Sequence, residues 1–320
     1  MKFSIITPVF NRADCIARCI ESVINQKRSK DCDWEYEHVI VNDGSKDDTD
    51  RIVTEYAERV PNIVYINFKE NKGTNAARNA AIKAATGDFC IILDSDDFFV
   101  ENALETISAT MLKKPGYKHY MFAPDDRKDY FDSNELLKNE QIITFRDFLS
   151  QKYSGDFIHA IQREIMQKYP FDESLRIYEG VFFLKFYREA QNTCFTNIVV
   201  TIRERGRTDS VTKEYIMSNK KAIINYIKAL STQLEWYKDE YIKYNLKRQI
   251  GNLYVQLIDN YILICDYKNC KKIFKCAKDE GINIPLHYNI IYCLRAGIIY
   301  RYLQYAYFVF KFKVLKIRVK

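Results

Sequence analysis

The chain has 320 residues, of which 47% are hydrophobic and 28% are charged, so it can bury a full globular core without disulfides. No apolar run reaches the roughly 18 residues that a membrane span requires, and we expect no transmembrane helix. The nine cysteines include no C-x-x-C pair, so we expect reduced, mostly buried thiols in a cytoplasmic protein and no zinc site.

The net charge of +7 is unevenly distributed along the chain. Residues 215–320 hold 19 of the 49 Lys and Arg but only 7 of the 42 Asp and Glu, so this stretch carries +12 and the residues before it carry −5. This asymmetry predicts an acidic N-terminal globule followed by a basic appendage.

Strand-like and helix-like segments alternate over the first hundred residues. Short apolar runs predict strands at residues 3–9, 36–42, 62–68 and 89–94. Helical spacing of apolar residues, or an alanine-rich run, predicts helices at residues 12–26, 49–60, 74–85 and 101–112. The alternation predicts an α/β fold with a mostly parallel sheet flanked by helices, where ligands bind beyond the carboxyl ends of the strands.

The rest of the chain changes character. The next hundred residues are less regular and include one clear strand at 194–202. After that the pattern is helical, with helical spacing through 220–264 and a further helix at 267–280. We therefore expect two parts, an α/β domain at 1–212 and a basic α-helical region at 213–320.

Polar segments follow three of the predicted strands. They are Pro8-Val9-Phe10-Asn11, Asn42-Asp43-Gly44-Ser45 and Asp94-Ser95-Asp96-Asp97. Because the carboxyl ends of parallel strands meet at one edge of a sheet, these segments are expected to converge. Three carboxylates within four residues repel each other, so they must face water or be neutralised.

Glycine-rich phosphate loops are missing. Neither G-x-G-x-x-G nor G-x-x-x-x-G-K-[S/T] occurs, so a glycine-rich backbone does not cradle a phosphate here. A divalent metal that is held by carboxylates and bridges phosphate oxygens is the alternative. Such a metal would neutralise the carboxylates of the acidic segment.

Four motifs occur in an order that resembles one known family. They are Pro8-Val9-Phe10-Asn11, Val41-Asn42-Asp43-Gly44-Ser45 with Asp47 and Thr49, Asn71-x-Gly73-x-x-x-Ala77-Arg78-Asn79, and Leu93-Asp94-Ser95-Asp96-Asp97. The chain resembles the inverting glycosyltransferases of family 2, with the GT-A nucleotide-sugar fold, closely over residues 3–100 and more weakly to about 212. The resemblance implies a nucleotide-binding half at 1–100 and an acceptor half at 101–212.

The implied reaction moves a sugar from a nucleotide diphosphate sugar, usually a UDP-sugar, to a hydroxyl of a saccharide or lipid-linked acceptor in surface polysaccharide synthesis. The resemblance places the nucleotide against Pro8, Phe10, Asn11, Asn42, Asp43, Arg78, Asp94 and Ser95. Many members have Asp-Asp where this chain has Asn42-Asp43. An Asn carbonyl also accepts hydrogen bonds, so either Asn42 or Asp43 could contact the nucleotide base. Arg78 is either a phosphate or base contact or a solvated helix residue.

The acidic segment contains the D-x-D pattern of the family. The resemblance implies that Asp94 lies near the ribose and that Asp96 binds a Mg²⁺ or Mn²⁺ ion on the diphosphate, which stabilises the leaving group. Asp97 is expected to cap the following helix, with Phe98 and Phe99 packed beneath it.

The general base that an inverting transfer requires lies where this chain departs from the family pattern. In the family it is usually the Asp of a Glu-Asp pair, and this chain has Glu179-Gly180 instead. Three alternatives remain: Glu179 is the base, or Asp172 or Glu173 replaces it, or the protein is a catalytically weak or inactive nucleotide-sugar-binding protein. We favour Glu179.

Two further basic features remain open. Arg205 and Arg207 either contact the diphosphate or form a plain basic loop. Residues 285–320 interleave Lys and Arg with aromatic and aliphatic residues, and no acidic residue follows Glu280. This segment either lies on an anionic membrane surface, on the inner face of the cell membrane, or forms a packed subdomain or homodimer interface. Nucleic acid is not expected, because the predicted catalytic face is acidic.

Overall fold

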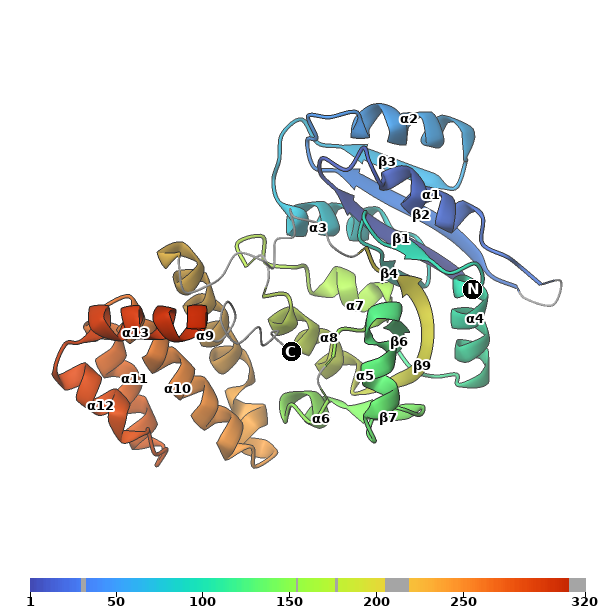
Figure 1. Cartoon of the computed structure of the whole chain (residues 1–320). Coiled ribbons are helices and arrows are strands. Elements are labelled where there is room, and N and C mark those ends of the chain that lie inside the picture. The colour runs from blue at the N-terminus through green and yellow to red at the C-terminus, as the bar shows by residue number, and fades with distance from the viewer. Residues whose placement is uncertain (30–32, 154, 176–177, 205–218, 311–320) are drawn as a thin grey trace. The chain divides into compact units, whose positions relative to one another are not determined.

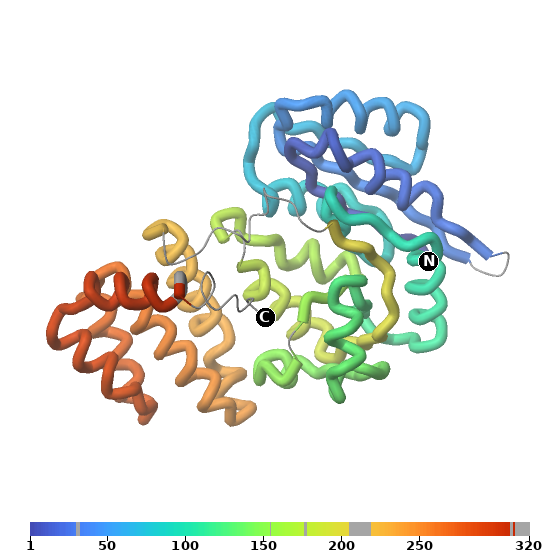
Figure 2. The backbone as a smooth tube through the Cα atoms, viewed as in Figure 1, coloured from blue at the N-terminus to red at the C-terminus, as the bar shows by residue number. Residues whose placement is uncertain are grey.

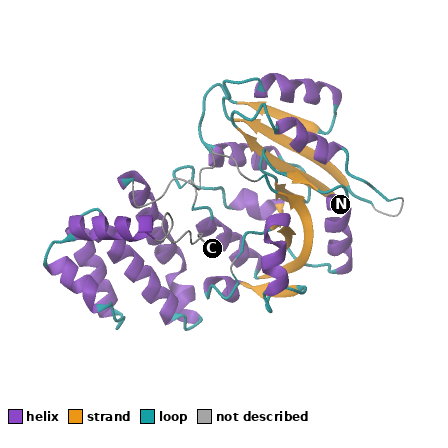
Figure 3. Cartoon of the chain, in the orientation of Figure 1, coloured by secondary structure: helices purple, strands orange, loops and turns teal. Residues whose placement is uncertain are grey.

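A computed structural model describes residues 1–29, 33–153, 155–175, 178–204 and 219–310. The chain divides into two compact units, residues 1–208 and 209–320 (Figure 1). Each unit is described by itself. Figure 2 follows the backbone from blue to red, and Figure 3 distinguishes the mixed first unit from the helical second unit.

The first unit is built on one sheet with the strand order β3-β2-β1-β4-β8-β6-β9-β5, and β7 pairs with β9. The strands are β1 (Lys2–Val9), β2 (Glu35–Asn42), β3 (Ile63–Asn67), β4 (Phe89–Ile92), β5 (Phe98–Phe99), β6 (His119–Pro124), β7 (Gln141–Thr144), β8 (Ile158–Gln162) and β9 (Asn192–Ile202). β1 to β4 pair in parallel, as predicted. Beyond β4 the sheet is mixed, because β8 runs antiparallel to both β4 and β6 while β9 runs parallel to β6.

Helices flank this sheet, which confirms the α/β prediction (Figure 3). They are α1 (Ile16–Ile24), α2 (Thr49–Arg59), α3 (Thr74–Ala84), α4 (Ala103–Lys113), α5 (Lys128–Ser133), α6 (Phe145–Leu149), α7 (Arg163–Lys168) and α8 (Gly180–Ala190), with a 3₁₀ turn at Asp125–Arg127. The apolar stripe of α1 joins Phe3, Ile5 and Val9 of β1 in the main core. Alternate residues of a strand face one side of the sheet, so β1 is buried by packing on both faces.

The alanine-rich helix α3 packs on β1 and β2. Ala77 and Ala81 are fully buried, and their small side chains allow the helix backbone to lie close to the sheet. The polar residues between these alanines are then carried at a fixed position beside the strand ends.

The second unit consists of helices, as predicted for the C-terminal region. They are α9 (Lys220–Lys243), α10 (Lys247–Leu263), α11 (Tyr267–Asp279), α12 (Leu286–Cys293) and α13 (Gly297–Val309). The predicted helical stretch 220–264 is two helices, because Asn245 adopts a left-handed φ of 57° and Leu246 N–H donates to the Tyr241 carbonyl at 2.8 Å. That hydrogen bond closes a Schellman-type helix end. Among the residues described, every helix is too short or too polar to cross a bilayer.

Candidate active site

The polar loops after β1 and β2 are joined by hydrogen bonds at the carboxyl edge of the sheet, as predicted. Asp43 N–H donates to the Val9 carbonyl at 2.8 Å. Asn11 N–H donates to Ser45 Oγ at 2.9 Å, and Asn11 Oδ1 accepts from Lys46 N–H at 2.8 Å. Asn11 holds a left-handed φ of 50°, a conformation that Asn tolerates better than most residues.

Asp47 and Thr49 explain why the helix predicted at 12–26 begins only at Ile16. Ala13 N–H donates to Asp47 Oδ2 at 3.0 Å, and Arg12 N–H donates to Thr49 Oγ1 at 2.9 Å. These bonds hold residues 12 and 13 in a turn against the second loop. Burial opposes ionisation of Asp47, but hydrogen bonds from Thr49 and Ala13 hold its pKa below the usual value.

Gly44 is required where the second loop passes the segment before α3. Its φ is +71°, and an added Cβ would lie 2.5 Å from the Glu70 carbonyl carbon and 2.8 Å from the Asn71 nitrogen. Both contacts are with backbone, which cannot move aside as a flexible side chain would. The close approach keeps the two loops together.

We predict that Gly44→Ala lowers the free energy of unfolding by roughly 2 kcal/mol or more, since backbone strain and a backbone clash act together. Urea denaturation followed by circular dichroism measures the loss. Gly116→Ala is the matched control, because Gly116 has a φ of +92° but open space around its Cβ position. Equal losses in the two variants would contradict the clash.

The predicted pair Asn42 and Asp43 is buried, with exposed fractions of 1% and 3%. Asp43 accepts hydrogen bonds from Lys72 N–H at 2.6 Å and Gly73 N–H at 2.9 Å. Asn42 Oδ1 accepts from Ser45 N–H at 3.1 Å. These side chains therefore fix the loop that leads into α3, and a contact between either of them and a nucleotide base stays a prediction.

Arg78 of α3 connects the two halves of the candidate site. Its Nη2 donates to Asp94 Oδ1 at 3.1 Å and its Nη1 donates to Glu179 Oε1 at 3.3 Å, across separations of 16 and 101 residues. The Arg78 side chain is only 14% exposed, and Glu179 is 21% exposed. A planar guanidinium suits such a bridge because it presents several donors in fixed directions. Arg78 is therefore not a solvated surface residue.

Glu179 stands at the start of α8, where its carbonyl accepts from Phe182 N–H at 2.8 Å. A Cβ on the next residue, Gly180, would meet nothing within 4 Å. Packing therefore does not require glycine at the position where the resemblance expects an aspartate.

The other candidate bases, Asp172 and Glu173, have structural partners. Asp172 Oδ1 accepts from Ser174 N–H at 2.8 Å, and Glu173 Oε1 accepts from Asn79 Nδ2 at 3.3 Å. Asn79 also exchanges two hydrogen bonds with the backbone of Phe171, at 2.8 and 2.9 Å. Asn79 of the quoted motif thus attaches α3 to the segment before Glu179, a role that the sequence did not reveal.

The acidic segment is divided by its environment. Asp94 is 51% exposed and bound to Arg78, whereas Asp97 is 14% exposed. Asp97 Oδ1 accepts from Glu204 N–H at 3.1 Å, and its Oδ2 lies 3.8 Å from Arg203 Nε. Burial, reinforced by the charge of Asp94, raises the pKa of Asp97 to about 7.

The prediction that Asp97 caps a helix is wrong. Phe98 and Phe99 form β5, which pairs with β9, and α4 begins four residues after Phe99 with Asn102 at its cap position. Asp97 instead connects the acidic segment to the end of β9. The acidic segment is also connected to α1, because Arg18 donates to the Asp96 carbonyl at 3.1 Å.

Comparison with known proteins decides the family. Residues 4–172 match Glycosyl transferase family 2, which is more than half of the chain. The chain belongs to this family. It is a glycosyltransferase, and the arrangement of its first unit is the GT-A fold that the resemblance implied.

Relatives of this glycosyltransferase include the GalNAc(5)-diNAcBac-PP-undecaprenol beta-1,3-glucosyltransferase of Campylobacter jejuni, 25% identical over 283 residues that cover 86% of each chain. Among solved structures, S. aureus TarS residues 1–349 aligns with a TM-score of 0.59 at 20% identity over 81% of each chain, and TarS has also been solved with UDP-GlcNAc. The mannosyltransferase PcManGT of Pyrobaculum calidifontis, solved with GDP-Man and Mn²⁺, aligns with a TM-score of 0.54 at 16% identity over 94% of this chain and 86% of its own.

A metal ion at the acidic segment of the family 2 site would need further ligands from the donor. Within the part of the chain that the structure describes, no group of three or more His, Cys, Asp and Glu side chains could hold a metal ion. Mg²⁺ usually binds one or two carboxylates plus substrate phosphates rather than an all-protein cage. Asp96 is partly exposed, so one protein carboxylate is accessible to such an ion.

Three other predicted residues of the glycosyltransferase site lie on or beside the loops after β1 and β4. Pro8 is buried at the end of β1, Phe10 is 39% exposed, and Ser95 is buried. Arg205 and Arg207 lie outside the described residues. Arg203, two residues before Arg205, forms an ion pair with Asp156 at 2.8 Å.

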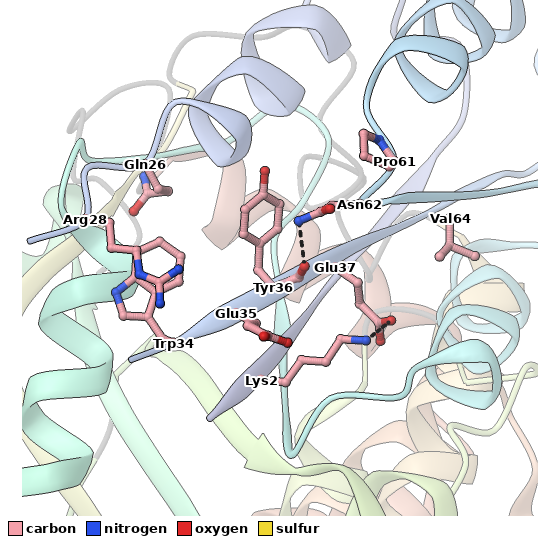
Figure 4. Close-up of a pocket in the computed structure, with 10 residues that line it drawn as sticks. All are labelled: Lys2, Gln26, Arg28, Trp34, Glu35, Tyr36, Glu37, Pro61, Asn62 and Val64. Carbon is pink, nitrogen blue, oxygen red and sulfur yellow. Dashed lines mark hydrogen bonds and ion pairs between the residues drawn. The ribbon is translucent and has the colours of Figure 1, made fainter. Parts of the chain in front are cut away.

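A cavity of about 590 Å³ lies at the opposite edge of the sheet, at the amino ends of β1 and β2 (Figure 4). It is lined by Lys2, Gln26, Arg28, Trp34, Glu35, Tyr36, Glu37, Pro61, Asn62 and Val64. Lys2 and Glu37 form an ion pair at 3.0 Å. Burial opposes ionisation of Glu37, but hydrogen bonds from Ser4 and Thr86 lower its pKa to about 2. This cavity is separate from the site at the carboxyl ends.

Proposed function

We propose that this glycosyltransferase is metal-dependent and inverting, and that it moves a sugar from a UDP-sugar to a hydroxyl of a saccharide or lipid-linked acceptor in surface polysaccharide synthesis. The observation that carries the proposal is the Arg78 bridge between Asp94 and Glu179. It joins a donor-side carboxylate and a candidate base at one edge of the sheet. Two relatives support the substrates, since TarS was solved with UDP-GlcNAc and the Campylobacter enzyme is named for an undecaprenol-linked acceptor.

The donor nucleotide would lie on the loops after β1, β2 and β4. Phe10 offers an exposed aromatic face for a base, and Arg78 offers donors to phosphate oxygens once the nucleotide is present. Asn11, the pair Asn42 and Asp43, and the segment from Asp94 to Ser95 complete the surface. Arg205 and Arg207 are proposed as further diphosphate contacts on sequence grounds.

Asp96 would hold Mg²⁺ or Mn²⁺ together with the donor diphosphate. The metal would neutralise the charge that builds up on the departing nucleoside diphosphate. PcManGT, solved with Mn²⁺, supports this part of the proposal.

Glu179 is the proposed general base. As the acceptor oxygen attacks the anomeric carbon opposite the diphosphate, the new C–O bond forms while the bond to the diphosphate breaks, and Glu179 takes the hydroxyl proton. Arg78 acts as a positioning residue by holding the Glu179 carboxylate in place. Attack from the opposite face inverts the anomeric configuration.

The proposed setting is the cytoplasm, on the inner face of the cell membrane where a lipid-linked acceptor is anchored. The described cysteines are free thiols, which agrees with a reducing compartment. A homodimer remains a proposal, and no nucleic-acid partner is proposed.

Calorimetry with UDP and Mn²⁺ tests the donor class. We expect UDP to bind in the presence of Mn²⁺ and to bind at least about tenfold more weakly without it, because the ion bridges protein and diphosphate. GDP is the matched control for base recognition, and we expect it to bind more weakly than UDP. Equal binding with and without the metal would contradict the metal site.

A further inference from the structure

Helices α12 and α13 of the second unit expose an unusual amount of apolar surface. Between residues 286 and 310, ten large apolar or aromatic side chains are 47–73% exposed. Representative members are Leu286, Ile290 and Leu294, at 73%, 50% and 71%, and Ile299 and Leu303, at 65% and 64%. Nine exposed large hydrophobic residues are scattered over the rest of the described chain. A concentrated patch of this kind marks an interaction surface.

The exposed side chains follow helical spacing. Leu286, Ile290 and Leu294 are four residues apart, and so are Ile299 and Leu303, so each set lies on one side of its helix. Tyr288, Ile291, Tyr292 and Tyr300 instead pack on a small core around Ile258, Ile262 and Cys270. Both helices are thus apolar on an inner and an outer face, a pattern expected where something other than water covers the outer one.

The charge near this surface is mainly positive: residues 267–310 hold seven Lys and Arg against Asp279 and Glu280. Within residues 281–310 the charged side chains are Arg295 and Arg301, and no Asp or Glu occurs there. The preceding helix α11 adds five exposed lysines, at positions 268, 271, 272, 275 and 278. Exposed apolar and tyrosine side chains together with a net positive charge fit an interface with anionic lipid headgroups. A second copy of the same surface would bring like charges together, which opposes self-association.

We propose that α12 and α13 bind an anionic membrane surface, with their outer apolar side chains inserted among the headgroups and the lysines of α11 adding electrostatic attraction. This inference rests on the proposed function, because a lipid-linked acceptor requires the enzyme to work at a membrane. The outer apolar side chains of the second unit would then attach the enzyme to the membrane. The first unit is then free to carry the chemistry.

Co-sedimentation of the full chain with vesicles tests the inference. We expect the wild-type protein to bind vesicles of phosphatidylglycerol and phosphatidylcholine, to bind phosphatidylcholine alone far more weakly, and to lose binding as salt is raised. The double variant Ile299→Glu/Leu303→Glu is expected to bind at least about tenfold more weakly. The matched control is Ile242→Glu/Leu112→Glu, which changes side chains that are 60% and 63% exposed elsewhere, and it is expected to bind like the wild type.

Three results would overturn the inference. The first is that the wild-type protein does not bind anionic vesicles. The second is that the control double variant loses as much vesicle binding as Ile299→Glu/Leu303→Glu. The third is that the wild type forms a dimer by light scattering, that Ile299→Glu/Leu303→Glu dissociates this dimer, and that vesicles are not bound. Circular dichroism shows whether the variants are folded. UDP calorimetry without vesicles keeps the two proposals distinct: vesicle binding without UDP binding would contradict the proposed donor, whereas UDP binding without vesicle binding would contradict only the lipid surface.

Discussion

Replacing Glu179 with Gln is expected to lower the turnover of sugar transfer by about 10²- to 10⁴-fold, the usual contribution of a general base. Gln keeps the length of Glu and an oxygen that accepts from Arg78, but it cannot take the acceptor proton. UDP affinity is expected to change by less than about threefold, because the loss is confined to the transition state. Initial rates at saturating donor and acceptor measure the effect.

Glu173→Gln is the matched control, since it makes the same change six residues away in the chain at a carboxylate bound to Asn79. It is expected to retain turnover. Undiminished turnover in Glu179→Gln would show that Glu179 is not the base. A loss of turnover in Glu173→Gln alone would identify Glu173 as the base. The open space at Gly180 allows a further test, in which Gly180→Asp is expected to restore part of the turnover to Glu179→Gln.

Replacing Asp96 with Asn is expected to lower metal-dependent turnover by about a hundredfold or more, since a metal that neutralises a leaving group supplies several kcal/mol. Chelation with EDTA is expected to reduce the wild type to a similar level, and Mn²⁺ to restore it. Titration of Mn²⁺ followed by electron paramagnetic resonance, with UDP present, is expected to show weaker metal binding in the variant. This readout does not depend on turnover.

Asp48→Asn provides the control for Asp96→Asn. Asp48 is a 71% exposed carboxylate that pairs with Arg51 on the surface, so removing its charge is expected to leave metal binding and turnover unchanged. EDTA-treated wild-type enzyme that keeps its full rate would contradict the metal role altogether.

The convergence of the loops could be predicted because parallel strands place their carboxyl ends together. The polar residues after the strands are visible in the sequence, and Asn11 indeed contacts Ser45 and Lys46. The Arg78–Glu179 contact could not be predicted in this way, because a helical arginine is usually solvated and its partner lies 101 residues further along the chain. Only the fold brings the two side chains together.

Two errors have identifiable physical causes. Asp97 precedes an aromatic pair and resembles a helix cap, but the pairing of β5 with β9 places it beside Arg203 and Glu204 instead. The break between α9 and α10 escaped notice because Asn245, rather than Gly, adopts the left-handed conformation that ends the helix. Cys265 plays the same part after α10, where Asp266 N–H donates to the Tyr261 carbonyl at 2.9 Å.

A donor hydrolysis screen over nucleotide sugars, run with and without Mn²⁺, tests the proposed transfer most directly because it does not require the acceptor. We expect that at least one UDP-sugar is cleaved faster when Mn²⁺ is present, that the released sugar has the inverted anomeric configuration, and that Glu179→Gln and Asp96→Asn both suppress the reaction. UDP binding without any cleavage would identify a nucleotide-sugar-binding protein that lacks catalysis. The proposed function would be contradicted if no donor showed metal-dependent cleavage and no donor showed metal-dependent binding.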